Sequence, residues 1–209
     1  MATPLDVLVI ESRPGAAAAA ARALEAAGHT TTRCHPDGAG AAFGCRAMLD
    51  PGDCPLDDRP DVALLVRDGE AEPGMYEQGA SCALRDGIPL VEAGTPSVPD
   101  PYEPWLAGRV DGDGRDIVAA CEAARTAALG ALRRRILTLV RPSLAAAHIS
   151  MAGVTCRIEP RGLGLRVAFD IFGPVPPGLR QALAVRTLDA VRGGHRPYEH
   201  VSVSVTEVG

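Results

Sequence analysis

Five polar residues stand at the ends of short apolar runs, where their types could bind a ligand or a partner. They are Glu11, Ser12, Arg67, Asp68 and Glu92. Short apolar runs of this kind are typical of strands buried on both faces of a parallel sheet. Because open α/β sheets bind ligands outside the carboxyl ends of their strands, we interpret these five residues as candidates for a ligand or partner site.

The chemistry that these residues could perform is incomplete. Ser12 has no histidine at a recognisable spacing, so a hydrolase would need His29 or His35 to lie across the cleft. The chain contains no lysine, which excludes the lysine of phosphate-binding loops, kinases and Schiff bases. We therefore expect no catalytic residue, no cofactor and no metal. A small-ligand binder or an enzyme that uses this end of the sheet stays as the alternative.

The elements that must position these residues alternate between strand and helix. The central strand is expected at Asp61–Val66, between Arg59-Pro60 and Asp68-Gly69. The other expected strands are Leu5–Ile10, Thr30–Cys34, Ile88–Glu92 and, at the sheet edge, Leu106–Val110. The expected helices are Ala16–Ala27, a short one at Ala41–Leu49, and Met75–Arg85. This alternation predicts a doubly wound, flavodoxin-like α/β domain with a parallel five-stranded sheet over residues 1–110.

A long connector helix is predicted within residues 111–142, from Asp116 to Val140, with Pro142 ending it. Apolar residues recur on one face at steps of three and four, and they are our candidates for self-association: Val118, Cys121, Leu132, Ile136 and Leu139. This face would pack against its own chain or against a second copy. Arg133, Arg134 and Arg135 form a basic patch, which keeps nucleic-acid or membrane-surface binding as a further alternative.

Residues 143–209 change to neighbouring strands and predict a small α+β domain of ββαβ order. Val154–Glu159 and Leu165–Phe172 flank a glycine-rich turn and predict a hairpin. A helix should run from Pro176-Pro177 to Val191, followed by a strand of alternating valine and serine or threonine at Val201–Thr206. Such alternation is typical of a strand with one face exposed to water.

Charge is divided unevenly along the chain. Residues 1–110 contain 8 arginines and 17 acidic residues, whereas residues 111–209 contain 13 arginines and 9 acidic residues. The split suggests two domains with different partners or with attraction for each other. The many Ala, Gly, Pro and Arg residues are typical of a GC-rich coding sequence.

Compartment and metal binding are predicted from the cysteines and the hydropathy. The six cysteines form no Cys-x-x-Cys pair, and we expect them reduced. Cys34, His35, Cys45 and Cys54 could in principle meet around zinc, but their spacing matches no common module. The chain has no recognisable signal peptide and no apolar run of membrane-spanning length. These features predict a cytoplasmic protein.

The pattern of residues 5–110 resembles the receiver domain of bacterial response regulators. In that family, acidic residues after the first strand bind magnesium, and here the matching positions hold Glu11 and Ser12. The phospho-accepting aspartate at the end of the third strand matches Val66, unless Asp68 replaces it through a local shift. The family's lysine after the fifth strand is absent. The resemblance therefore implies a degenerate receiver, a pseudo-receiver, that signals by binding without phosphorylation.

The last part of the chain resembles the alkaline shock protein family of Gram-positive bacteria. The residues that carry the resemblance are the strand pair Gly153–Arg157 and Leu165–Ile171, the helix that ends near Val191, and Val201–Val205. This resemblance implies a scaffold that self-associates or docks on partners. We expect a non-catalytic regulatory or scaffold protein with protein partners, and a homo-oligomer.

Overall fold

The computed structural model describes residues 3–35, 47, 53–69, 74–95, 99–111, 114–161, 163–193 and 198–209. The chain separates into two compact units, Met1–Thr126 and Ala127–Gly209. The predicted short helix at Ala41–Leu49 and the zinc candidate Cys45 lie outside the described residues, apart from Ala47.

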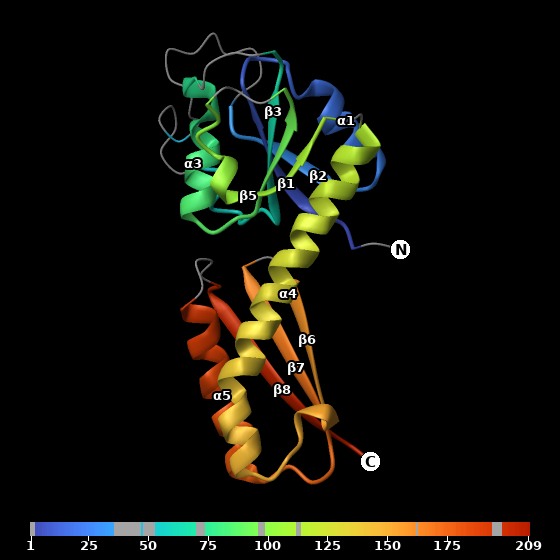
Figure 1. The fold of residues 1–209 in the computed structure, drawn as a ribbon, viewed down its shortest axis with the longest axis vertical. Helices are drawn as coiled ribbons and strands as arrows, with labels where there is room; N and C mark the ends of the chain where they lie inside the picture. The colour runs from blue at the N-terminus through green and yellow to red at the C-terminus, as the bar shows by residue number, and fades with distance from the viewer. Residues whose placement is uncertain are drawn as a thin grey trace. The chain divides into compact units, whose positions relative to one another are not determined.

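The first unit is built on a parallel five-stranded sheet with the order β2-β1-β3-β4-β5 (Figure 1). The strands are β1 (Asp6–Glu11), β2 (Thr30–Arg33), β3 (Val62–Arg67), β4 (Leu90–Gly94) and β5 (Leu106–Val110). The central strand β3 is buried along its whole length, and β5 lies at the edge. This confirms the predicted doubly wound arrangement and the places of both strands in it.

Helices cover both faces of this sheet, which is why its inner strands lack polar alternation. On one face, α1 (Ala18–Ala26) and the first part of α4 (Gly114–Ala146) pack through Leu24, Ile117 and Cys121 against alternate strand residues such as Leu64. On the other face, α3 (Gln78–Arg85) packs on Leu8, Leu65 and Leu90. Two short 3₁₀ turns flank this second face: η1 (Met75–Glu77), which precedes α3, and η2 (Glu103–Trp105), which precedes β5.

Helix α4 corrects one prediction, because it continues through Pro142 as far as Ala146. A proline inside a helix costs about 3 kcal/mol, since it lacks an N–H and its ring clashes with a carbonyl one turn earlier. Ile136, Val140 and Leu144 follow each other at four-residue steps and are fully buried in the second unit. Burial of one leucine contributes about 1.5–3 kcal/mol. Packing of Leu144 therefore offsets much of the cost of Pro142.

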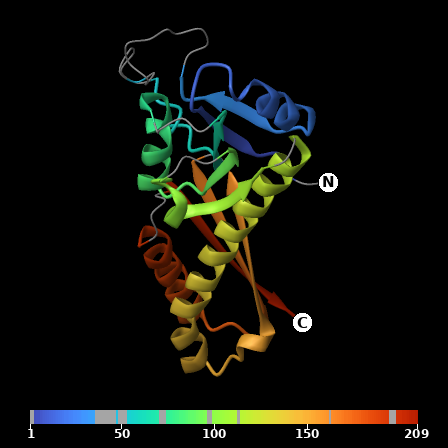
Figure 2. The ribbon, with the colours of Figure 1, turned by 45° about the horizontal axis from the view of Figure 1, so that its top comes forward.

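The second unit is a three-stranded sheet with helices on one face (Figures 1 and 2). The chain enters it through the 3₁₀ turn η3 (Met151–Gly153). Strands β6 (Val154–Arg161) and β7 (Gly164–Phe172) pair antiparallel, and β8 (His200–Val208) pairs parallel to β7. Inward residues such as Val167 and Phe169 meet α5 (Pro177–Arg192) and the second part of α4. The predicted small α+β unit of ββαβ order is confirmed.

Candidate functional site

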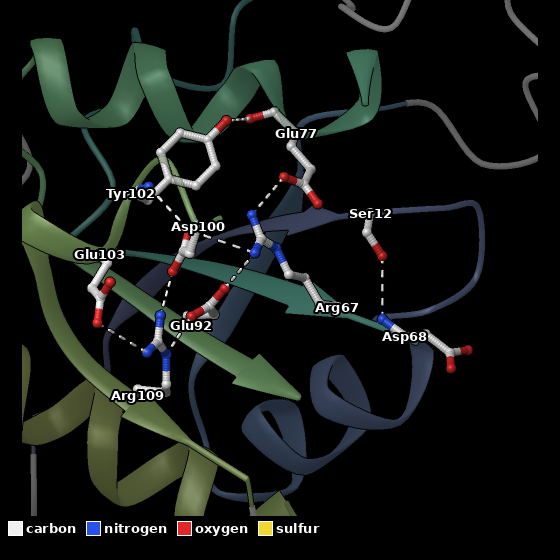
Figure 3. A network of polar contacts seen from close by, with 9 residues as sticks. All are labelled: Ser12, Arg67, Asp68, Glu77, Glu92, Asp100, Tyr102, Glu103 and Arg109. Carbon is white, nitrogen blue, oxygen red and sulfur yellow. Dashed lines mark hydrogen bonds and ion pairs between the residues drawn. The ribbon is translucent and has the colours of Figure 1, made fainter. Parts of the chain in front are cut away.

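The structure divides the five predicted site residues into separate groups. Figure 3 shows four of them: Ser12, Arg67, Asp68 and Glu92. Successive residues of a strand point to opposite faces of a sheet. Glu11 is paired with Val66, which belongs to the core beneath α1, so Glu11 lies on that face. Its Oε2 accepts the backbone N–H of Ala17 at 3.2 Å, at the start of α1. Glu11 therefore caps a helix and does not face Arg67.

Ser12 and Asp68 form a local link between two loops. The Ser12 backbone N–H donates to the Val66 carbonyl at 3.0 Å, and the Ser12 hydroxyl accepts the Asp68 N–H at 3.2 Å. The Asp68 carboxylate pairs with Arg13 on the exposed surface. Figure 3 shows the Asp68 carboxylate directed away from Arg67.

Arg67 and Glu92, in contrast, lie together in a buried cluster on the face covered by α3. The Arg67 side chain is 1% exposed, and its Nη2 lies 2.9 Å from Oε2 of Glu77. Its Nη1 lies 2.9 Å from Oε1 of Glu92 and 3.5 Å from Oδ1 of Asp100. One guanidinium group thus contacts three carboxylates that are almost completely buried.

A second arginine closes the cluster from the edge strand β5. Nε of Arg109 donates to Oε2 of Glu92 at 2.6 Å, and its Nη2 pairs with Asp100. Glu103, at 3.9 Å from Nη1 of Arg109, lies on the exposed rim. We call Arg67, Glu77, Glu92, Asp100 and Arg109 the Arg67 network.

Tyr102 connects the Arg67 network to the surrounding backbone. Its ring centroid lies 5.7 Å from Cζ of Arg67, within the range of a cation–π contact. Its hydroxyl donates to the Glu77 carbonyl at 3.3 Å, and its N–H donates to Oδ1 of Asp100 at 3.0 Å. The network and Tyr102 thereby hold η1 and the segment from Asp100 to Trp105 in place.

The electrostatics of the network follow from its burial. Its three carboxylates outnumber its two guanidinium groups, so the ionised network has an excess of one negative charge. Desolvation raises the pKa of Glu92, even though the hydrogen bond from Arg109 and the charge of Arg67 act in the opposite direction. Burial also raises the pKa of Tyr102. The hydrogen bond to Glu92 raises the pKa of Arg109 and keeps it charged.

The sequence reasoning missed three members of the network, Glu77, Asp100 and Arg109, and also the adjoining Tyr102. One signal was present in the sequence. Glu92 stands between Val91 and Ala93 in an apolar strand, and a buried carboxylate requires a partner. Only the strand register of the structure shows that Arg109 is paired with Glu92 on the adjacent strand.

An exposed aromatic side chain lies in the sequence between Asp100 and Arg109 of the Arg67 network. Trp105 ends η2 immediately before β5 and is 63% exposed. Tryptophan is the residue type most enriched among energetically dominant interface contacts. Because β5 is an edge strand, Trp105 and β5 form a surface that a partner could reach.

The apolar residues of α4 that were candidates for self-association are covered by their own chain. Cys121 is fully buried in the first unit, and Ile136 is fully buried in the second. Val118, Leu132 and Leu139 are partly buried against the same cores. In this conformation Cys121 and Ile136 cannot contribute to a contact between copies.

The basic patch, by comparison, is exposed. The side chains of Arg133, Arg134 and Arg135 face solvent, and the Arg135 guanidinium lies beside Gly193 at the C-terminal end of α5. A cation at a helix C-terminus is favourable. The second unit, residues 127–209, has 11 arginines and 5 acidic residues, whereas residues 1–126 have 10 and 21.

The described residues include neither a cluster of metal-binding side chains nor a membrane-spanning helix. That part of the chain contains no group of three or more histidine, cysteine or acidic side chains placed to hold a metal ion. Cys34 is buried in the core beneath α3. Of the helices that the structure describes, none has the length and apolar character needed to cross a membrane.

A shallow groove of about 640 Å³ lies between α1 and the start of α4, away from the Arg67 network. Alanine side chains and Val118 form most of its walls, and Arg115 and Glu122 line it as well. Such a volume is within the range of small-molecule sites, but its lining contains few converging polar groups.

Comparison with known proteins gives no family for this chain. No protein-family model matches it, and no curated protein matches it. The resemblances to receiver domains and to alkaline shock proteins therefore stay hypotheses.

Proposed function

We propose that this chain is a non-catalytic regulatory or scaffold protein, which acts through protein–protein binding and self-association and does not depend on phosphorylation. The observation that carries the proposal is the Arg67 network. It lies on the α3 face and includes Arg67 at the carboxyl end of β3, where open α/β sheets bind ligands. Side chains of the protein itself supply both the charges and the counter-charges there.

The end of β3 supports the same proposal. A receiver domain requires a carboxylate at this place, and here Val66 occupies it and packs in the core beneath α1. The nearest carboxylates are already engaged: Glu11 caps α1, and Asp68 pairs with Arg13. A magnesium ion needs several oxygen ligands in near-octahedral geometry, and these two residues do not converge.

The partner surface that we propose for the first unit is Trp105 with the edge strand β5. The Arg67 network holds Asp100 and Arg109 on either side of Trp105, so the indole is presented from an ordered segment. A preorganised anchor loses less entropy when a partner binds. The exposed indole thus belongs to a segment that buried ion pairs hold before and after it in the sequence.

The first experiment tests independence from phosphorylation. The full chain is incubated with acetyl phosphate and Mg²⁺, and its intact mass is measured. We expect no added phosphoryl group in the wild type or in Asp68→Asn. Stoichiometric phosphorylation that Asp68→Asn abolishes would overturn the proposal and restore an active receiver.

The second experiment tests the partner surface. The purified chain is cross-linked in extract from its own source, with Trp105→Ala as the variant and Val185→Ala as the matched control. Val185 is 50% exposed on α5 in the other unit. We expect Trp105→Ala to lose about tenfold or more of the captured partner without a change in melting temperature. Equal capture by all three proteins would refute Trp105 as the anchor.

A further inference from the structure

Strand β8 forms one edge of the second sheet. It has nine residues, and from Val201 to Thr206 it contains no proline and no charged side chain. The opposite edge strand, β6, contains Pro160 together with Arg157 and Glu159. Proline and charges are the usual means by which an edge strand avoids pairing with another chain. The two edges of one sheet therefore differ in their capacity for a new strand.

The outward backbone groups of β8 follow from its pairing. In a parallel ladder, both polar groups of a residue point to the same side, and the sides alternate along the strand. The Gly173 N–H donates to the Val208 carbonyl at 3.2 Å, so Val208 faces β7. The Val205 carbonyl instead accepts Nη1 of Arg180 at 2.5 Å. Val201, Val203 and Val205 therefore turn their backbone groups to the open side.

The sequence of β8 is self-complementary when two copies run antiparallel. Val201-Ser202-Val203-Ser204-Val205 reads the same in both directions. A two-fold axis at Val203 would place Val201 opposite Val205 on the helix-covered face and Ser202 opposite Ser204 on the other face. An axis at Ser204 would instead place Val201 opposite Glu207. The apolar pattern sets the register of a strand pair, and it selects the axis at Val203.

Helix α5 extends the same surface. Arg180 reaches the open edge of β8, and Ala184 and Leu188 follow it at four-residue steps on the same side of the helix. Both of these apolar side chains are partly exposed. The two-fold axis at Val203 would also place Glu199 of one copy opposite Glu207 of the other, and Arg180 lies beside Glu207. Arg180 would then supply a positive charge beside this pair of carboxylates, which is a complementary arrangement of charges.

We propose that two copies of this chain associate through antiparallel pairing of β8 about Val203, which joins their sheets into one six-stranded sheet. This inference rests on the self-association in the proposed function, and it names the surface and the partner. The contact is isologous, so it closes at a dimer and leaves no free β8 edge. Pairing requires Arg180 to release the Val205 carbonyl, while its exposed pair with Glu207 can stay in place.

The experiment uses two double variants of the full chain, one with lysine and one with glutamate at both Ser202 and Ser204. The mass of each protein in solution is measured by sedimentation equilibrium. Ser202→Lys/Ser204→Lys and Ser202→Glu/Ser204→Glu each place like charges opposite one another, so we expect each to dissociate roughly tenfold more readily than the wild type. An equimolar mixture should restore a dimer that contains one copy of each. The mixture also shows that both variants are folded.

The matched control places a charge on the other edge, as Thr155→Lys in β6, and should keep the wild-type dimer. A wild-type dimer that neither charged variant weakens would overturn pairing through β8 and leave self-association standing. A wild type that is monomeric at about 100 µM would overturn both, since a specific dimer at cellular abundance requires a lower Kd.

Discussion

Arginine–carboxylate pairs occur in both units, but in opposite surroundings. In the first unit, Arg67 is 1% exposed beneath a helix, and its carboxylate partners are almost completely buried. In the second, Arg157 is 58% exposed and pairs with Asp170 on the open face of the sheet. The parallel sheet has helices on both faces, whereas the mixed sheet has helices on one. The same chemical pair is thus a buried structural element in one unit and a solvated contact in the other.

The difference shows how far burial decides the consequence of losing a charge. Water can hydrate Asp170 when Arg157 is removed. It cannot readily reach Glu77 or Glu92, which would stay buried without a counter-charge. Breaking a buried pair costs about 3–5 kcal/mol, whereas exposed pairs contribute about 0–1 kcal/mol.

Replacement of Arg67 should have the largest effect. We expect Arg67→Ala to lower the free energy of unfolding of the first unit by about 3–5 kcal/mol.

Burial raises the pKa of Cys121 to about 12 and that of Cys156 to about 11, so both thiols are protected while folded. Because Cys121 lies in the first core and Cys156 in the second, thiol labelling resolved by peptide mass spectrometry follows each unit separately.

In Arg67→Ala, labelling of Cys121 should accelerate strongly, while labelling of Cys156 should stay at the wild-type rate. Arg85→Ala is the control, since Arg85 is an exposed arginine of the same unit that pairs with Asp86. Equal acceleration of Cys121 by both variants would refute a special role for the Arg67 network.

Replacement of Pro142 should act on the second unit in the opposite direction. Pro142→Ala restores a backbone N–H within α4 and removes a steric clash, so we expect a stabilisation of about 1–2 kcal/mol. Slower labelling of Cys156 and a higher urea midpoint would verify this. An unchanged or lower midpoint would show that Pro142 is accommodated without strain.

Glu92 should make the free energy of unfolding depend on pH. The pKa of Glu92 is raised from 4.5 in the folded state, so the folded protein holds this proton to a higher pH than the unfolded chain. The wild type should therefore lose stability relative to Glu92→Gln as the pH rises from about 4.5 through the raised pKa. The slope is limited to about 1.4 kcal/mol per pH unit. Urea unfolding of both proteins between pH 4.5 and 7.5 measures it, and parallel curves would contradict the shift.

Replacement of Arg157 should have the smallest effect. Arg157→Ala removes an exposed pair, so we expect a loss of less than about 1 kcal/mol that shrinks further in high salt. Urea unfolding at low and high salt provides the measurement. A loss as large as that of Arg67→Ala would abolish the contrast between the two units.

The fold was largely predictable from the sequence. Asp61–Val66 lacks polar alternation and is bounded by Pro60 and Gly69, and it forms the buried central strand. The end of α4 was not predictable, because proline chemistry favours a stop at Pro142. Only the core of the second unit, which buries Leu144, carries the helix further.

The candidate site was predictable only in part. The sequence marked Arg67 and Glu92 as charged residues at the ends of apolar strands, and the structure brings these two together. It also marked Glu11 as part of the same site, yet the strand register places Glu11 beneath α1 on the other face. A shift of one residue along a strand reverses the face, and the sequence pattern does not specify strand ends to that precision.

The sequence by itself determined the order of strands and helices, the absence of lysine chemistry, and the alternating, self-complementary character of β8. These properties depend on residue type and on spacings of a few residues. Only the tertiary structure decided that Glu77, Asp100 and Arg109 gather around Arg67, since they come from segments that meet through the packing of β3, β4 and β5. Burial then makes the loss of any one of these charges costly, because the free energy of an unpaired charge depends on the solvent that surrounds it.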